Sequence, residues 1–248
     1  MKLTVATFNI RNINDRYAER KPLLASAFAA LDADIVGLQE VVFSPPRQDD
    51  LLSGELPDRH YKSFDARVER NPNFGNAILC GAGEVLAHEE VGLGHNRVAH
   101  RILVALPGLR TLWFANTHLH HVPGEPSVRV EQARAICEWM AAAPASDAQI
   151  VAGDFNTPPF EPAYGIMTAA GFRSAFLEAN GAEPAVTWPS GIQAETMDTD
   201  GDPNCLDYIW LRGSANATLA RLACNEPAPA DPTLYPSDHF AILAEIGV

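Results

Sequence analysis

Long apolar runs are absent from this chain of 248 residues: no stretch approaches the ~20 consecutive apolar residues that a membrane-spanning helix requires. The opening residues, MKLTVATFNI, read directly as a strand and lack the charged segment, apolar core and cleavage site of a signal peptide. We therefore expect no membrane association and no export.

Cysteine is scarce and scattered. Cys80, Cys137, Cys205 and Cys224 form no CxxC pair and no tightly spaced framework, which indicates reduced thiols in a cytoplasmic protein. The chain also lacks internal repeats, low-complexity tracts and a Gly/Ser linker, while 47% of its residues are hydrophobic. We expect one domain over residues 1–248, as a monomer.

Basic residues are the minority, with 18 Lys and Arg against 31 Asp and Glu, a formal net charge of −13 and a pI of about 4.9. An acidic protein repels polyanions at long range, so this balance argues against binding of bulk duplex DNA as the main activity. A bound cation can reverse the local field. The charge therefore favours a small phosphate-ester partner, with nucleic acid as the disfavoured alternative.

Apolar runs rich in Val and Ile recur along the chain and predict about ten strands with few helices. The expected strands cover 2–10, 35–42, 76–80, 84–93, 97–106, 111–118, 149–153, 206–212, 217–224 and 240–246. Helices are expected over 22–31, 128–142 and 163–170, and long loops over 43–60, 183–205 and 225–236. In the second helix, Arg129 and Gln132 are predicted on the solvent face. So many strands predict mixed sheets, in an α/β protein of the α+β type.

Five short polar segments lie at the ends of these strand-like runs. They are Phe8-Asn9-Ile10, Gln39-Glu40-Val41, Asn116-Thr117-His118, Gly153-Asp154-Phe155-Asn156 and Ser237-Asp238-His239. Side chains at strand ends are held rigidly yet reach solvent, as catalytic groups must. Carboxylate and amide oxygens together with two imidazoles suit metal-assisted hydrolysis of phosphate esters.

Taken singly, most of these segments have an ordinary structural explanation. Asp154 and Asn156 could form an Asx turn before Pro158, and His118 could be a buried, hydrogen-bonded histidine. Asp207, within LDYIWL, is harder to explain because a carboxylate in an apolar strand is costly without a partner. A histidine is the natural partner, since the pair also fixes the imidazole tautomer.

Taken together, and in this order, the motifs TFNIR, VGLQEV, FGNAIL, NTHL, GDFN, LDYIW and SDH resemble the endonuclease/exonuclease/phosphatase superfamily of metal-dependent phosphohydrolases. The resemblance implies a four-layered sandwich, with two mixed β-sheets packed face to face, helices outside and the site at one edge. It also implies Mg²⁺ as the cofactor, with Mn²⁺ as the alternative.

By this resemblance, Glu40 is the direct metal ligand, with Asp238 and Asn9 completing the metal pocket. Asp154 would orient or deprotonate the attacking water, and Asn156 would hold the phosphoryl group. Hard oxygen donors are consistent with Mg²⁺ or Mn²⁺.

The catalytic set implied by the resemblance also contains two histidines. His239, paired with Asp207, would contact the scissile phosphate, and His118 would do so from the opposite side. Asn76 and His120 are the expected substrate contacts. Many bacterial relatives have Asp at the position of His120, which here adds a titratable group.

Other functions remain open at this point. One is a nuclease of the same superfamily, although Phe74 stands where that branch tends to carry Tyr. Another is a zinc metallohydrolase using the HLHH cluster from His118 to His121, and a third is a non-catalytic binding module. The acidic loop with Asp198, Asp200 and Asp202 does not match the EF-hand template and is a candidate specificity loop.

Overall fold

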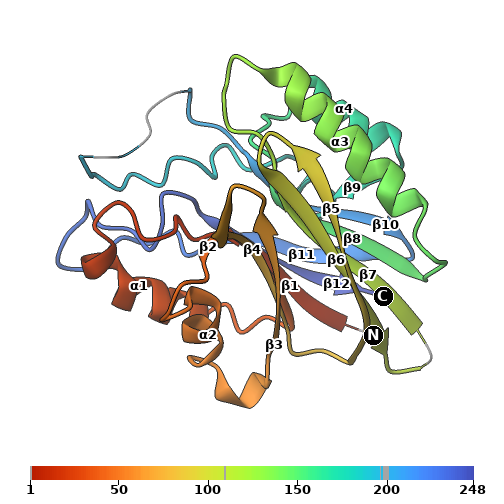
Figure 1. The fold of residues 1–248 in the computed structure, drawn as a ribbon, viewed down its shortest axis with the longest axis horizontal. Coiled ribbons are helices and arrows are strands. Elements are labelled where there is room, and N and C mark those ends of the chain that lie inside the picture. Colours follow the sequence, from red (N-terminus) through yellow and green to blue (C-terminus); the bar gives the residue numbers. More distant parts are fainter. Residues whose placement is uncertain (1, 109, 196, 198–200) are drawn as a thin grey trace.

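Two six-stranded sheets pack face to face in the computed structural model, which describes residues 2–108, 110–195, 197 and 201–248 (Figure 1). The first sheet has the order β11-β12-β1-β2-β4-β3, and the second β5-β6-β7-β8-β10-β9. The strands of the first sheet are β1 (Lys2–Asn9), β2 (Ile35–Val42), β3 (Lys62–Val68), β4 (Asn71–Cys80), β11 (Asn216–Ala223) and β12 (Ala241–Gly247). Those of the second are β5 (Glu84–Gly94), β6 (Arg97–Leu106), β7 (Arg110–His118), β8 (Ala148–Asp154), β9 (Arg173–Ser174) and β10 (Asp207–Gly213).

Apolar side chains from both sheets form the core between them. Ile35 of the first sheet belongs to the same buried cluster as Phe114 and Ile150 of the second. Burial of each such side chain stabilises the fold by about 1.5–3 kcal/mol, which holds the two layers together.

Helices cover the two outer faces (Figure 1). They are α1 (Tyr17–Ala29), α2 (Gln48–Ser53), a 3-10 turn η1 (Pro57–Arg59), α3 (Pro126–Ala141), α4 (Pro162–Ala169) and α5 (Ala175–Asn180). Phe28 of α1 belongs to the same buried cluster as Phe8 of the first sheet, and Ile136 of α3 to the same cluster as Trp113 of the second. The result is the predicted four-layered sandwich of two mixed sheets. In the described part of the chain, no helix is long and apolar enough to cross a bilayer.

The sequence prediction missed five elements, namely β3, α2, η1, β9 and α5, of which β3 and α2 show the reasons best. Strand β3 escaped it because KSFDARV carries polar residues at alternate positions, as befits an edge strand with one side toward solvent. Helix α2 lies within 43–60, which was predicted to be a loop, because its six residues are too few to show a helical period.

The predicted solvent face of α3 was also wrong at two positions. Arg129 and Gln132 are each only 1% exposed. The Arg129 guanidinium donates to the carbonyl oxygen of Val122 at 2.7 Å and to Glu161 Oε2 at 2.8 Å. These two side chains are buried because they bind the segment that follows β7, a role that helical periodicity cannot reveal.

Strand direction explains why the polar segments meet. Strands β1 and β2 are parallel to each other, as are β7 and β8, so their carboxyl ends reach one edge of the sandwich. Strands β12 and β10 run antiparallel to β1 and β8 and therefore begin at that edge. Asp207, which begins β10, pairs in register with Asp154, which ends β8.

His100 makes the stability of this fold depend on pH. It is fully buried in β6, and its ring nitrogens lie 3.3 Å from His88 Nε2 and 3.3 Å from Asn116 Nδ2. Burial, and then the His88 ring, hold the pKa of His100 well below its usual 6.5. The folded protein keeps this imidazole neutral, whereas the unfolded chain binds a proton below about pH 6.5, so stability falls as the pH falls.

We expect His100→Gln to reduce the slope of unfolding free energy against pH by up to about 1.4 kcal/mol per pH unit below pH 6.5, because one titration is removed. Urea unfolding of both proteins between neutral and mildly acidic pH measures this slope. The remaining groups titrate in both proteins and cancel in the comparison. Parallel curves for the two proteins would contradict this prediction.

Candidate active site

A β-bulge directs Glu40 into a cavity at this edge. The register between β2 and β4 shifts between Leu38 and Val41, and Glu40 has a left-handed φ of 57°. A residue other than glycine rarely adopts this conformation, and such strain is concentrated at functional sites. The two carboxylate oxygens of Glu40 accept hydrogen bonds from Asn9 Nδ2 at 3.2 Å and Asn12 Nδ2 at 2.6 Å.

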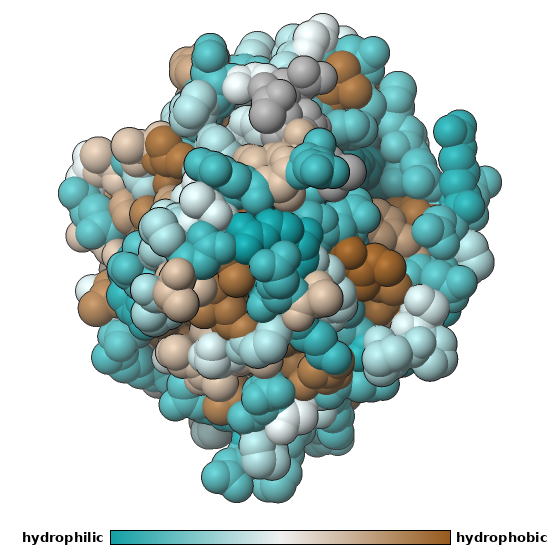
Figure 2. Space-filling view, turned by 90° about the vertical axis from the view of Figure 1, so that its left-hand side faces the viewer, coloured by the Kyte–Doolittle hydropathy of each residue, from teal (hydrophilic) through white to brown (hydrophobic). Residues whose placement is uncertain are grey.

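The cavity has a volume of about 660 Å³. Predicted site residues that line it are Glu40, His118, His120, Asp154, Asn156, Asp238 and His239. Figure 2 views this edge of the molecule and shows hydrophilic residues gathered in the middle of the face, with hydrophobic patches beside them. The structure thus brings most of the predicted site residues to one hollow.

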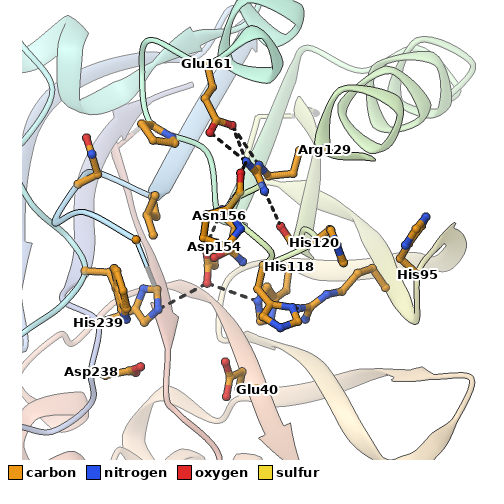
Figure 3. A pocket seen from close by; sticks show the side chains of 18 of the residues that line it. Glu40, His95, His118, His120, Arg129, Asp154, Asn156, Glu161, Asp238 and His239 are labelled. Atoms are coloured by element: carbon orange, nitrogen blue, oxygen red, sulfur yellow. Dashed lines mark hydrogen bonds and ion pairs between the residues drawn. The ribbon is translucent and has the colours of Figure 1, made fainter. Parts of the chain in front are cut away.

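Asp154 lies at the centre of this group (Figure 3). Its Oδ2 accepts from Asn9 Nδ2 at 3.0 Å, and its Oδ1 accepts from the backbone N–H of Asn156 at 2.9 Å. His118 Nε2 and His239 Nε2 lie 3.5 and 3.6 Å from Asp154 Oδ2. The carboxylate is therefore oriented by two amides and flanked by two imidazoles.

The predicted pair of Asp207 and His239 is present. His239 Nδ1 lies 2.9 Å from Oδ2 of the fully buried Asp207. Burial opposes a charge on His239, but the carboxylates of Asp207, Asp154 and Asp238 outweigh it and raise the pKa of His239 to about 10. His239 is thus held as an imidazolium whose Nε2 faces the cavity.

The pKa values of His118 and of Asp154 shift in opposite directions. Burial, followed by the charge of Arg97, lowers the pKa of His118 well below its usual value, so this ring is neutral. Burial raises the pKa of Asp154 to about 7, although His239 acts in the opposite direction. Neighbouring titratable groups whose surroundings push their pKa values apart are typical of acid–base sites.

Asp238 faces Glu40 across the floor of the cavity, as Figure 3 shows. Burial raises the pKa of Asp238, the Arg11 guanidinium lowers it, and the Glu40 charge raises it further. Arg11 Nε lies 3.5 Å from Asp238 Oδ2. Two carboxylates that repel each other in a buried place are a fitting site for a cation, and their oxygens suit Mg²⁺ or Mn²⁺.

Another group of possible metal ligands consists of Asp154, Asp207 and His239, whose ligand atoms lie within 4.8 Å of one another. In that group His239 Nδ1 is already engaged by Asp207 at 2.9 Å. Glu40 and Asp238 offer carboxylate oxygens alone, which are the donors that Mg²⁺ prefers.

Two further polar residues of the same segments join the sheets beneath the cavity. Gln39 Nε2 donates to Asn116 Oδ1 at 2.7 Å, and Asn116 Nδ2 donates to the carbonyl oxygens of Leu38 and Ala77, both at 2.9 Å. A Cβ on Gly37 would lie 2.9 Å from Asn116 Oδ1, so glycine makes room for this amide. These residues support the site from below.

Asn76, predicted as a substrate contact, is not on the cavity wall. Its buried amide donates to the carbonyl oxygen of Val98 at 3.0 Å and so links β4 to the second sheet. Phe74 lines the cavity in this region instead. In the acidic loop, Asp202 lines the cavity, whereas Asp198 and Asp200 lie outside the described residues.

Some residues that shape the site were not predicted. Asn12 binds Glu40, and Arg11 and Arg97 line the cavity. Burial lowers the pKa of Arg97, which the charges of Glu40 and Asp154 partly offset. The only available signal was that Arg11 and Asn12 directly follow the first polar segment. Arg97 begins a strand and resembles an ordinary solvated arginine in the sequence.

The two-sheet sandwich with these groups at one edge is the phosphoesterase and nuclease fold. The chain belongs to the Endonuclease/Exonuclease/phosphatase family, whose model matches residues 6–239. Members of this family are hydrolases and generally use a divalent metal. No curated protein matches the sequence significantly.

Solved structures share the fold over the whole chain. The endonuclease/exonuclease/phosphatase from Bacteroides vulgatus has a TM-score of 0.80 at 22% identity, covering 100% of this chain and 99% of its own. D. rerio TDP2, solved with a single-strand DNA product, has a TM-score of 0.78 at 19% identity, covering 100% and 99%. The human Nocturnin catalytic domain, solved with a sulfate anion, has a TM-score of 0.76 at 23% identity, covering 99% and 93%.

We expect Asp207→Asn to lower kcat by about 10- to 100-fold with little change in KM, because Asp207 orients and charges His239 without reaching the cavity. Steady-state kinetics on bis-p-nitrophenyl phosphate measure this split. Asp58→Asn, an exposed carboxylate in η1, is the matched control. Unchanged turnover in a folded Asp207→Asn protein would show that the pair has only a structural role.

Proposed function

We propose that the protein is a Mg²⁺-dependent phosphoesterase, able to use Mn²⁺, that hydrolyses a small phosphate ester by in-line attack of water. The observation that carries this proposal is the position of Asp154. It lies between a neutral and a charged imidazole, in one cavity with the Glu40 and Asp238 carboxylates.

Glu40 and Asp238, with Asn9 beside them, are the residues that would hold the metal. When bound, a divalent cation supplies electrostatic stabilisation of the phosphoryl oxygens. Asn9 Nδ2 donates to both Glu40 and Asp154, at 3.2 and 3.0 Å, so one amide positions the metal pocket relative to the group that binds water.

Asp154 is the group we assign to the attacking water. Its orientation is fixed by Asn9 and by the backbone N–H of Asn156, which leaves no freedom to turn away from the cavity. A carboxylate held in this way supplies orientation and can accept the proton of the water.

The phosphoryl group would be held by donors around this carboxylate. His239 offers a charged Nε2–H, and His118 lies on the other side of Asp154. Asn156 Nδ2 donates to the carbonyl oxygen of Leu119 at 3.1 Å, and the amide has a second hydrogen for a phosphoryl oxygen. Preorganised donors of this kind stabilise charge that develops in the transition state.

Water is the preferred nucleophile because the protein side chains near the cavity are poor ones. None of the four cysteines is among the lining residues, and burial raises the pKa of both Cys80 and Cys137 to about 11. Ser237 Oγ donates to the carbonyl oxygen of Asn9 at 2.7 Å and is buried. A single displacement by water, without a covalent intermediate, is therefore the simplest chemistry.

An anionic substrate has to overcome the net charge of −13. Arg11, Arg97 and Arg129 line the cavity beside five carboxylates, so the charge of a bound cation is needed in addition to make the local field favour an anion. A nuclease of the same family is the second candidate. Phe160, 79% exposed on the cavity rim, is the observation that favours it, because bases stack on exposed aromatic rings.

The proposal is tested with a panel of phosphomonoesters, small phosphodiesters and single-stranded oligonucleotides, each assayed with Mg²⁺, with Mn²⁺ and with chelator. We expect metal-dependent turnover, and Asp154→Asn to lower kcat by about 10²- to 10⁴-fold with little effect on KM. The folded Asp58→Asn protein again serves as control.

Hydrolysis of a chiral phosphorothioate ester tests whether water attacks phosphorus directly. A single in-line displacement inverts the configuration at phosphorus. Retention of configuration, or a trapped phosphoenzyme, would contradict direct attack by water. Absence of turnover on the whole panel with either metal would contradict the proposed function itself.

A further inference from the structure

Three side chains that can bind a transition metal meet at the mouth of the cavity. They are His95, His120 and Glu125, whose ligand atoms lie within 4.8 Å of one another. His120 Nε2 is 2.6 Å from Glu125 Oε2, and the ring centroids of His95 and His120 are 5.0 Å apart. Figure 3 shows His95 and His120 on the side of the cavity opposite His239.

The position of His95 is set by a tight hairpin. His95 and Asn96 join β5 to β6, and their φ angles of 50° and 58° are both left-handed. Two left-handed residues are characteristic of a type I′ turn, which matches the twist of the strands and has one defined shape. The hairpin therefore holds His95 at a fixed place beside His120.

His120 is held from behind by α3. Its backbone N–H donates to Gln132 Oε1 at 2.8 Å, and Arg129 donates to the carbonyl oxygen of Val122 at 2.7 Å. Arg129 is itself fixed by Glu161 at 2.8 Å. These buried polar contacts give the segment after β7 one conformation and leave the imidazole of His120 facing the cavity mouth.

Glu125 occupies the N-cap position of α3, but its side chain makes no capping hydrogen bond. A short polar side chain at this position normally accepts a bond from the first turn of the helix. Here the carboxylate faces His120 instead, and 51% of its side chain is exposed. Glu125 is thus directed toward the imidazole pair and away from its own helix.

We propose that His95, His120 and Glu125 bind a transition-metal ion of the Zn²⁺ class, at a site separate from the Glu40–Asp238 pocket. Two imidazoles and one carboxylate are a donor set that zinc prefers, whereas Mg²⁺ prefers oxygen donors alone. Three protein ligands leave one coordination position open for water or an anionic group. His95 and His120 line the cavity, so an anion entering it can reach that position.

Small side-chain movements would bring the three ligand atoms into the tetrahedral geometry that zinc requires. Zinc bonds of about 2.0–2.2 Å in a tetrahedron place the ligand atoms about 3.3 Å apart. The 2.6 Å contact between His120 and Glu125 must widen slightly, and His95 must approach. His95 and Glu125 are both exposed and can rotate, whereas the buried His120 serves as the fixed ligand.

The site is not the catalytic zinc centre that the HLHH sequence suggested as an alternative. The three histidines of that cluster have different surroundings: His118 faces Asp154, and His120 faces Glu125. The third, His121, has Nδ1 3.1 Å from a guanidinium nitrogen of Arg97. The inferred ion would lie at the rim of the cavity. It would not engage Asp154, the carboxylate that we assign to the attacking water.

Metal titration of tag-free Glu40→Gln protein, in excess Mg²⁺ and without substrate, tests the inference directly. Co²⁺ serves as the spectroscopic substitute for Zn²⁺. We expect one equivalent to bind with visible ligand-field bands, and X-ray absorption of the Zn²⁺ form to show imidazole nitrogens. Affinity should fall as the pH is lowered, because protons compete with the metal ion for the imidazole nitrogens.

His95→Asn and Glu125→Gln should each weaken Co²⁺ binding by at least about 100-fold, because loss of an outer partner alone costs about 10- to 100-fold. His60→Asn is the matched control, since His60 is also exposed and has the same left-handed φ of 50°. Asparagine tolerates that φ, so the fold is retained.

Absence of Co²⁺ binding in excess Mg²⁺ would overturn the inference. So would binding that His95→Asn and Glu125→Gln leave unchanged. Because no substrate is present, either result leaves the proposed hydrolytic function to its own test.

Discussion

A hydrogen bond joins the two sheets at the edge that contains the cavity. Asn9 Nδ2, at the end of β1, donates to Asp154 Oδ2, at the end of β8, over 3.0 Å. Gln39 and Asn116 form a second cross-sheet bond beneath it, at 2.7 Å. Both bonds are buried and exclude water, so a shift of one sheet against the other would leave costly unpaired amides. The relative position of every active-site group depends on this register.

Charge compensation is the second constraint. Asp154, Asp207 and Asp238 are almost completely buried, and three such carboxylates would destabilise the fold if they were unpaired. His239 is held charged between them, and Arg11 lies beside Asp238. The same arrangement that makes the carboxylates tolerable also places a charged imidazole and an oriented carboxylate at the cavity, where the proposed phosphate ester would bind. Stability and chemistry therefore share one set of contacts.

Much of the fold could be predicted because its strands are apolar runs with polar ends, and strand ends of one direction must meet at one edge. The cost of burying Asp207 predicted its partner His239, which the structure confirms. The bulge at Glu40 could not be predicted, because it depends on the register between two strands. Arg97 and Arg129 were missed for a related reason: their surroundings come from other elements, and the local pattern suggested solvent.

Anomalous diffraction from crystals grown with Mn²⁺ would show whether the Glu40 carboxylate binds a divalent cation in this cavity. We expect a peak about 2.0–2.2 Å from a Glu40 oxygen, with Asp238 bound directly or through one water. The peak should be absent from Glu40→Gln crystals. A Mn²⁺ ion bound by Asp154, Asp207 and His239, with Glu40 more than one water away, would show that Glu40 is not the metal ligand.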